Sequence, residues 1–354
     1  MKIKYSLIGF IIEFLFVTLN VKGDVNATYI QRNNALLQYS RKSLHMINNH
    51  NVQFVKVEYP YTWASTPSGF NKIKSIKGSP CTFKTKYLLP NTHAISNNVN
   101  YNTSNPQSMA YVGKYLFIVY SPHNDGKGFI IRYNTNKFNK KSFKETQQLS
   151  LKKNISGIKI GPQITIGHGQ SLAYNKKNHT LWMWKDRSDM KPTKESIIQQ
   201  ISTSKLVPNK TIKFTMDNRG VLISAGHNLT FDSNGHAYWW TVSHGSVKIY
   251  RGVLKQHSIK VELIKQLLKH STGTHEQSIG YNSRNGRLYL VSDDSIQSLP
   301  ISKTFNKSIL KPNNIRYTRF DSGREFEGID FDNSGHAILL KNRTPEAMIS
   351  EHQF

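Results

Sequence analysis

The sequence predicts an all-β protein built as a five-bladed β-propeller. A motif of polar, small, apolar, small and aromatic residues occurs five times, and each copy is followed by a turn and a short apolar strand. The aromatic residues that end the copies stand at positions 111, 174, 231, 281 and 331, so the period is 50 to 63 residues. Repeats of this length with strand patterning are typical of propeller blades.

The five copies differ in sequence but keep the same order of residue types. They are Gln107–Tyr111, Gln170–Tyr174, His227–Phe231, Gln277–Tyr281 and Glu327–Phe331. In three copies the turn contains an Asn-Gly or Ser-Gly step, which supplies the positive φ that tight hairpins need. In the first copy the turn is shortened to Val112-Gly113-Lys114.

Each unit continues with enough apolar segments to complete a blade. The second strands are expected at Tyr115–Tyr120, Leu181–Trp184, Ala237–Trp240, Leu288–Val291 and Ala337–Leu340, and third and outer strands follow them. Four strands in each of five units favour five blades. A six-bladed ring is the alternative, if residues 24–100 contain a degenerate copy. The aromatic side chains of the second strands (Trp182, Trp184, Trp239, Trp240 and Tyr289) are expected to fill the space between blades.

The chain divides into three parts by pattern. Residues 1–23 look like a signal peptide, because Lys2 and Lys4 precede an apolar stretch that ends in small residues. Residues 24–100 form a non-repeating segment that packs on the propeller or closes its last blade, which would hide two sheet edges. Within it, Ala35–Asn48 has helical spacing and predicts a short helix. Residues 101–354 carry the repeats and form the propeller.

Export and charge together indicate where the protein acts. The net charge is +27, which indicates a polyanionic partner; excess lysine that only keeps a secreted protein soluble is the alternative. With a signal peptide present, we expect an anionic cell-wall polymer or surface glycan as partner rather than nucleic acid. Glu13 lies inside the apolar stretch and argues against a stable membrane span. The single cysteine, Cys81, excludes an intramolecular disulfide and is expected to be a small packed residue.

The first position of the motif places one polar residue per blade at an equivalent point near the axis. These residues, here called the axial ring, are Gln107, Gln170, His227, Gln277 and Glu327. The default interpretation is structural, since polar groups in propeller channels bond to one another and to trapped water. Ligand binding is the functional alternative. Two residues earlier, a second set (His168, His275 and Glu325) is expected to lie beside the ring.

No motif in the chain indicates a metal or catalytic centre. Carboxylates near the axis could hold Ca²⁺, but a dense ligand motif such as HExxH is absent, so we expect no cofactor and keep calcium as the alternative. The sequence has no G-x-S-x-G, no P-loop and no G-x-G-x-x-G. Paired carboxylates for glycoside hydrolysis are available, yet nothing fixes their separation. We therefore predict a non-enzymatic protein, with a glycan-acting enzyme as the alternative.

Three segments resemble the helveticin J family, which are large, heat-labile class III bacteriocins of lactobacilli. They are Gly167–Tyr174, Thr274–Tyr281 and Glu325–Gly335. The resemblance implies antagonism toward related bacteria. Together with the signal peptide and the charge, it suggests a secreted, bacteriocin-like protein that binds the surface of related Gram-positive bacteria and is wall-associated or free. A wall-associated carbohydrate-binding or adhesion propeller without toxicity is the alternative.

Overall fold

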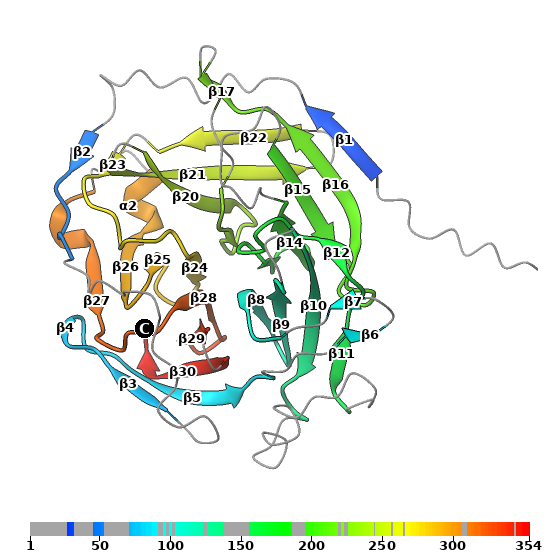
Figure 1. The fold of residues 1–354 in the computed structure, drawn as a ribbon. Helices are drawn as coiled ribbons and strands as arrows, with labels where there is room; N and C mark the ends of the chain where they lie inside the picture. The colour runs from blue at the N-terminus through cyan, green and yellow to red at the C-terminus, as the bar shows by residue number, and fades with distance from the viewer. Residues whose placement is uncertain are drawn as a thin grey trace, which may run out of the picture.

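The computed structural model confirms an all-β, five-bladed propeller. It describes residues 27–31, 45–52, 71–90, 95–96, 99–100, 103–122, 126–137, 156–185, 196–218, 221–222, 226–243, 245–255, 258–264, 266–305, 310–342 and 345–354. The predicted signal peptide, residues 1–23, lies outside these ranges. Figure 1 shows the five sheets arranged around one central axis, with the motif strands innermost.

Each blade is a mainly antiparallel sheet that begins with its motif strand and runs outward. Blade 1 contains β8 (Pro106–Val112), β9 (Tyr115–Tyr120), β10 (Lys127–Asn134), β11 (Ile158–Ile160) and β12 (Ile164–Thr165). Blade 2 contains β13 (Ala173–Asn175), β14 (Thr180–Trp184), β15 (Ser196–Ile201) and β16 (Pro208–Phe214). Blade 3 contains β19 (Thr230–Phe231), β20 (Ala237–Ser243), β21 (Ser246–Lys255), β22 (Ser258–Leu263) and β23 (Gln266–Leu268).

The last two blades follow the same order. Blade 4 contains β24 (Ser278–Asn282), β25 (Arg287–Ser292), β26 (Ser295–Pro300) and β27 (Arg316–Arg319), with the short helix α2 (Ile301–Phe305) and the 3₁₀ turn η3 (Pro312–Asn314) between the last two strands. Blade 5 contains β28 (Phe326–Phe331), β29 (His336–Lys341) and β30 (Glu346–Gln353). Two small hairpins stand apart: β6 (Ile95–Ser96) with β7 (Val99–Asn100), and β17 (Asp217–Asn218) with β18 (Val221–Leu222).

The N-terminal segment supplies outer strands to four of the five blades. β5 (Thr82–Leu88) pairs antiparallel with the C-terminal strand β30, and β3 (Lys72–Lys74) pairs with β5. β4 (Lys77–Gly78) pairs with β27 of blade 4. β2 (His45–Ile47) and β1 (Ala27–Gln31) add parallel edges to blades 3 and 2. These strands lie on the outside of the ring in Figure 1 and cover sheet edges that would otherwise offer unpaired backbone groups.

The prediction of a helix at Ala35–Asn48 is wrong for residues 45–48, the part of this range that the structure describes. His45–Ile47 form the strand β2, which pairs in register with Gln266–Leu268. Ile47 is buried against blade 3 in this pairing. The edge strand β23 thus determined the local conformation, because pairing with it satisfies backbone hydrogen-bonding groups and buries Ile47. The helical spacing of the leucines in this range was misleading.

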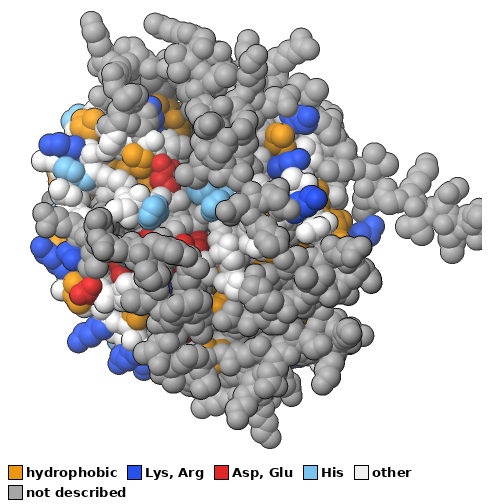
Figure 2. Space-filling model, in the orientation of Figure 1, with side chains coloured by type: hydrophobic (Ala, Val, Ile, Leu, Met, Phe, Trp, Pro, Cys, Tyr) orange, Lys and Arg blue, Asp and Glu red, His pale blue; other side chains and the backbone are white. Residues whose placement is uncertain are grey.

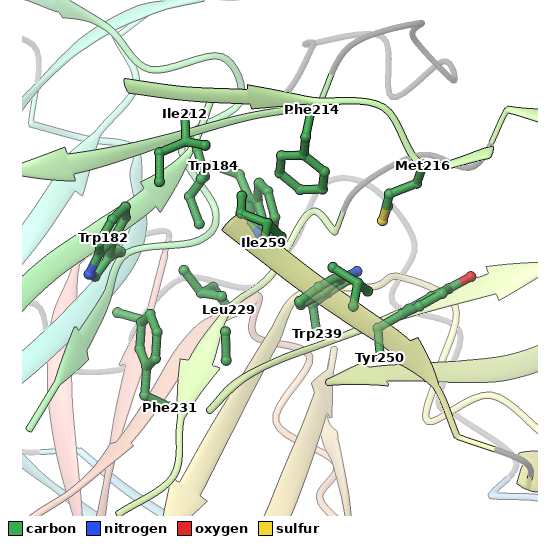
Figure 3. Close-up of a cluster of buried hydrophobic side chains, with 14 of the residues drawn as sticks. Trp182, Trp184, Ile212, Phe214, Met216, Leu229, Phe231, Trp239, Tyr250 and Ile259 are labelled. Atoms are coloured by element: carbon green, nitrogen blue, oxygen red, sulfur yellow. The ribbon is translucent and has the colours of Figure 1, made fainter. Parts of the chain in front are cut away.

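A separate apolar cluster fills each of the five spaces between neighbouring blades. The aromatic side chains of the second strands are all buried, which confirms their predicted packing role. Consecutive strand residues face opposite sides of the sheet, so Trp239 enters the cluster between blades 2 and 3 while Trp240 enters the next one. Figure 3 shows the first of these clusters, in which Trp184, Phe214, Trp239 and Tyr250 lie together.

Two indole N–H groups also link neighbouring blades, one joining blade 2 to blade 3 and the other joining blade 3 to blade 4. Trp184 Nε1 donates to the Asn228 carbonyl at 3.2 Å, and Trp240 Nε1 donates to the Ser278 carbonyl at 3.0 Å. Both acceptors occupy the second position of the following copy of the motif. The tryptophans therefore fix the inner strand of the next blade as well as filling the space beside it.

A buried polar cluster joins the N-terminal segment to blade 5. Glu346, the first residue of β30, accepts hydrogen bonds from Arg324 Nη1 at 2.9 Å, Asn71 Nδ2 at 3.2 Å and Thr85 Oγ1 at 2.5 Å. Lys341 lies near the Arg324–Glu346 ion pair, and its Nζ is 5.6 Å from the Phe326 ring centre. Burial first, and then the positive charge of Arg324, lower the pKa of Lys341 to about 7. The cluster thus joins the N-terminal segment, through Asn71 and Thr85, to the C-terminal strand β30.

Candidate functional site

The motif strands line the axis in three layers. Strand alternation brings positions 1, 3 and 5 of each copy to the centre. Position 3 contributes a buried apolar layer in which each side chain belongs to a different interblade cluster: Met109, Leu172, Leu229, Ile279 and Ile329. A cavity of about 30 Å³ lies here, with Gln170 at its boundary. The polar axial ring forms the layer above, at the end of the axis where the motif strands begin.

The structure brings all five predicted members of the axial ring into one hydrogen-bonded network. Gln170 is its centre: its Nε2 donates to Glu327 Oε2 at 2.7 Å and also to Gln277 Oε1, and its Oε1 pairs with His227 Nε2 at 2.9 Å. Blades 2, 3, 4 and 5 are joined by these three contacts. Gln170 is only 2% exposed, so its side chain crosses and closes the axis rather than lining an open channel.

Blade 1 joins the network through two asparagines. Asn342 Nδ2 donates to Glu327 Oε1 at 3.1 Å and to Asn105 Oδ1 at 2.7 Å, and Gln107 Nε2 donates to the same Asn105 oxygen at 3.0 Å. Gln277 Nε2 extends the network outward to Asp293 Oδ1 at 3.3 Å. Gln107 Oε1 is buried and has no hydrogen-bond partner among the described residues, so this acceptor of the network is left unsatisfied there.

The predicted second set lies around the end of the axis, which we call the channel mouth. The His168 ring lies 4.8 Å from the His227 ring, and both imidazoles are half-buried. His275 is more than half exposed, and its Nε2 lies 3.9 Å from Asp293 Oδ2. Glu325 is half-buried in the connection into blade 5. Figure 2 shows histidine and acidic side chains gathered near the centre of this face, with lysine and arginine on its rim.

Glu276 is a mouth residue that the sequence patterns did not single out. Its Oε1 accepts the Val242 backbone N–H at 2.6 Å. Burial raises the pKa of this carboxyl to about 7, although the Val242 N–H and the charge of His227 act in the opposite direction. Glu276 stands one residue before Gln277, and its hydrogen bond to Val242 and the effect of the His227 charge place it at the mouth near His227. Perturbed carboxyls of this kind mark functional sites more often than ordinary surface.

Substituting Glu276 by Gln should change how stability depends on pH. Because the folded pKa of about 7 exceeds the unfolded value of 4.5, the folded chain binds more protons between these pH values. The contribution of Glu276 is therefore fully present below pH 4.5 and is lost as pH rises through 7, by at most roughly 3 kcal/mol. Urea unfolding of both proteins across this range measures it. Parallel pH profiles for wild type and Glu276→Gln would show that Glu276 is not titrating there.

No metal centre forms among the described residues. Within those ranges, no group of three or more His, Cys, Asp or Glu side chains is close enough to hold an ion. The carboxylates considered for calcium are separated by amide partners: Glu327 is engaged by Gln170 and Asn342, and Asp293 by Gln277. Cys81 is partly buried against the cluster between blades 4 and 5, and burial raises the pKa of its thiol to about 12. It is therefore a protonated packing residue at neutral pH.

Three network residues lie outside the motif, Asn105, Asn342 and Asp293, and the motif did not place the last two at the mouth. Asn342 follows β29, whose last residue, Lys341, pairs with Phe326 next to Glu327. A residue that follows the second strand of an antiparallel hairpin returns to the end where the first strand began. Hairpin register in the sequence could therefore have placed Asn342, and in the same way Asp293 after β25, at the mouth.

Comparison with known proteins finds only a distant likeness to solved structures. No model of a known protein family matches the chain, and no curated protein sequence matches it. Similar solved structures include a glucose dehydrogenase, at 8% identity over 80% of this chain and 99% of that chain, with a TM-score of 0.41. Streptogramin B lyase matches at 9% identity over 79% and 97%, with a TM-score of 0.38. An exo-β-1,3-galactanase from Phanerochaete chrysosporium matches at 12% identity over 79% and 64%, with a TM-score of 0.41.

Proposed function

We propose that the protein is secreted and binds a glycan of bacterial surfaces at the channel mouth, without catalysis. The observation that carries the proposal is the combination of side chains there: imidazoles, carboxyls and amides stand above a floor closed by Gln170. Such a set offers both donors and acceptors for hydroxyl groups. The floor is rigid because one network ties it to all five blades.

The surface charge supports the same partner. The chain carries a net charge of +27, and basic side chains occupy the rim of this face in Figure 2. A basic rim concentrates the protein on anionic cell-wall polymers, whereas the less basic mouth selects the ligand. Among the residues that the structure describes, no helix has the length and apolar character needed to cross a membrane.

Replacing Gln277 or Glu327 by Ala should weaken glycan binding more than it weakens the fold. Each replacement removes hydrogen bonds worth about 1 kcal/mol apiece, and water can take their place at the mouth. We expect binding to purified cell walls of lactic acid bacteria to fall by more than about tenfold while the melting temperature moves a few degrees. Binding is measured in about 0.5 M salt, which screens nonspecific attraction to the basic rim.

Gln199→Ala is the matched control, because Gln199 is a buried glutamine on β15, away from the axis. Full wall binding by both ring variants would assign the ring a purely structural role and refute the proposal. The resemblance to the helveticin J family extends the proposal to killing of related bacteria. A spot test of the mature protein on a panel of lactic acid bacteria decides that extension separately from binding.

One observation favours a glycan-acting enzyme as the second candidate. A carboxyl with a pKa of about 7, as in Glu276, has the proton affinity of a general acid near neutral pH. Release of new reducing ends from purified walls, abolished by Glu276→Gln, would establish this function. Binding without product release leaves the non-catalytic proposal in place.

A further inference from the structure

The shortened turn of blade 1 leaves a groove on the face opposite the channel mouth. The motif strands begin at the mouth, so the turns that follow them lie at the other end of the axis. Blade 1 turns with two residues, Gly113 and Lys114, because Val112 pairs directly with Tyr115. The neighbouring turns are longer: four residues separate Asn175 from Thr180 in blade 2, and five separate Phe331 from Ala337 in blade 5.

The space not filled by blade 1 is a groove of about 410 Å³. We call it the blade-1 groove, and its lining includes Tyr111, Gly113, Tyr174, Lys176, His179 and the turn 332–334. Elsewhere on this face the turns close on each other: Asn175 Nδ2 donates to the Gly235 carbonyl at 3.4 Å, and Asn282 Nδ2 donates to the Gly335 carbonyl at 3.2 Å. The volume falls in the range of small-molecule sites.

Two tyrosines from neighbouring blades flank the groove. Tyr111 and Tyr174 occupy the same motif position, and both are half-buried, so each presents part of an aromatic ring with a polar tip. The Tyr174 hydroxyl lies 3.3 Å from His179 Nδ1, which fixes the imidazole at the rim. His179 is itself held in the left-handed conformation, with φ of 57°.

The polar groups of the groove come from both sides and carry no strong excess of charge. Blade 2 contributes the exposed side chains of Lys176 and His179. Blade 5 contributes the exposed Asn333 and Ser334 and the half-buried Asp332, whose Oδ1 accepts the backbone N–H groups of Ser334 and His336 at 2.9 Å each. Aromatic surface combined with donors and acceptors, in a ligand-sized groove, suits a ring that has apolar faces and hydroxyl edges.

We propose that the blade-1 groove binds an uncharged sugar ring, with Tyr111 and Tyr174 against its faces and the blade 2 and blade 5 turns at its hydroxyl groups. This site is distinct from the channel mouth and does not depend on the function proposed for it. A chain with both sites would hold glycans on its two opposite faces, so each site would raise the effective concentration of ligand at the other when the glycan is polymeric.

Saturation-transfer NMR of the full mature chain tests this proposal with glucose, galactose, mannose and N-acetylglucosamine as probes. We expect saturation transfer to at least one sugar. Ser334→Trp places a large side chain in the groove and should weaken that sugar's affinity by about tenfold or more. Asn234→Trp is the matched control, since Asn234 is exposed at the equivalent turn position of blade 3 and its backbone N–H donates to Asp232 just as that of Ser334 donates to Asp332.

Two further variants separate this site from the mouth and guard against misfolding. Tyr174→Ala should lower the affinity as Ser334→Trp does, whereas Tyr281→Ala, at the same motif position but not in the groove, should not. Glu327→Ala weakens the mouth, so the comparison of Ser334 with Ser334→Trp is repeated in the Glu327→Ala protein, where the same loss of affinity is expected. No signal from any of the sugars would overturn the proposal. Equal affinity in Ser334→Trp and wild type, or displacement of the sugar by inorganic phosphate, would overturn it as well.

Discussion

Glu346→Ala should destabilise the protein by about 3–5 kcal/mol, because it breaks a buried ion pair and removes the carboxylate that Arg324 contacts. Glu346 is fully buried and Arg324 is 4% exposed. Without the carboxylate, the Arg324 guanidinium loses its anionic partner, and Asn71 and Thr85 each lose an acceptor. Lys341 worsens the loss, because Glu346 is one of the two carboxylates that favour its charged form.

Urea unfolding followed by tryptophan fluorescence measures this cost. Glu346→Gln is the informative comparison, since its side-chain oxygen still accepts one hydrogen bond but carries no charge. Thr85→Val removes the hydrogen bond to Glu346 and the one that Thr85 Oγ1 accepts from the Asn71 backbone N–H, and should cost about 2 kcal/mol, less than Glu346→Ala. An unfolding midpoint for Glu346→Ala equal to that of wild type would mean that the charge pair contributes nothing to holding the N-terminal segment on blade 5.

Trp239→Ala should cost a similar amount, about 3–5 kcal/mol, for a different reason. The Trp239 ring is fully buried, lies edge-on to Trp184 at 5.2 Å between ring centres and stacks on Tyr250 at 5.6 Å. A Cβ atom at Gly226 or Gly252 would lie 2.5 or 3.1 Å from the nearest atom of the same indole. The absence of side chains at these two glycines therefore leaves the space that the Trp239 ring occupies. Its removal leaves a cavity in the cluster between blades 2 and 3, whose side chains Figure 3 shows, and the packed surroundings relax only partly.

Phenylalanine substitutions distinguish packing from hydrogen bonding. Trp239 Nε1 has no hydrogen-bond partner among the described residues, whereas Trp184 Nε1 donates to the Asn228 carbonyl. Trp184→Phe should therefore be less stable than Trp239→Phe by roughly 1 kcal/mol. Equal midpoints for the two, measured by circular dichroism, would show that the indole link between blades 2 and 3 contributes nothing.

The repeat made the fold and the axial ring predictable. A motif at equal strand positions has to place its first residues at one end of one axis, so Gln170, His227 and Glu327 could be expected to meet. The position of Gln170 across the axis could not be predicted, because it depends on side-chain rotamers and on which group each side-chain amide hydrogen-bonds to. The sequence left the structural and ligand-binding interpretations of the ring open, and the structure shows the ring residues hydrogen-bonded into a floor beneath the mouth.

Features without a repeat were harder to predict. The strand β2 depends on an edge that lies more than 200 residues later in the chain, since His45 pairs with Gln266. The spacing of apolar residues around His45 cannot indicate a pairing partner so distant in the sequence. The blade-1 groove was visible in the sequence only as a missing pair of turn residues between Val112 and Tyr115, and its meaning depends on the lengths of the two neighbouring turns.

The pairing of β5 with β30 also determines when this chain can fold. Thr85 contacts Glu346 across a sequence separation of 261 residues, so the ring cannot close before its last strand has been synthesised. Contacts of such long range make folding slow. A nascent chain of this topology therefore cannot close its ring for as long as its C-terminal strand is missing.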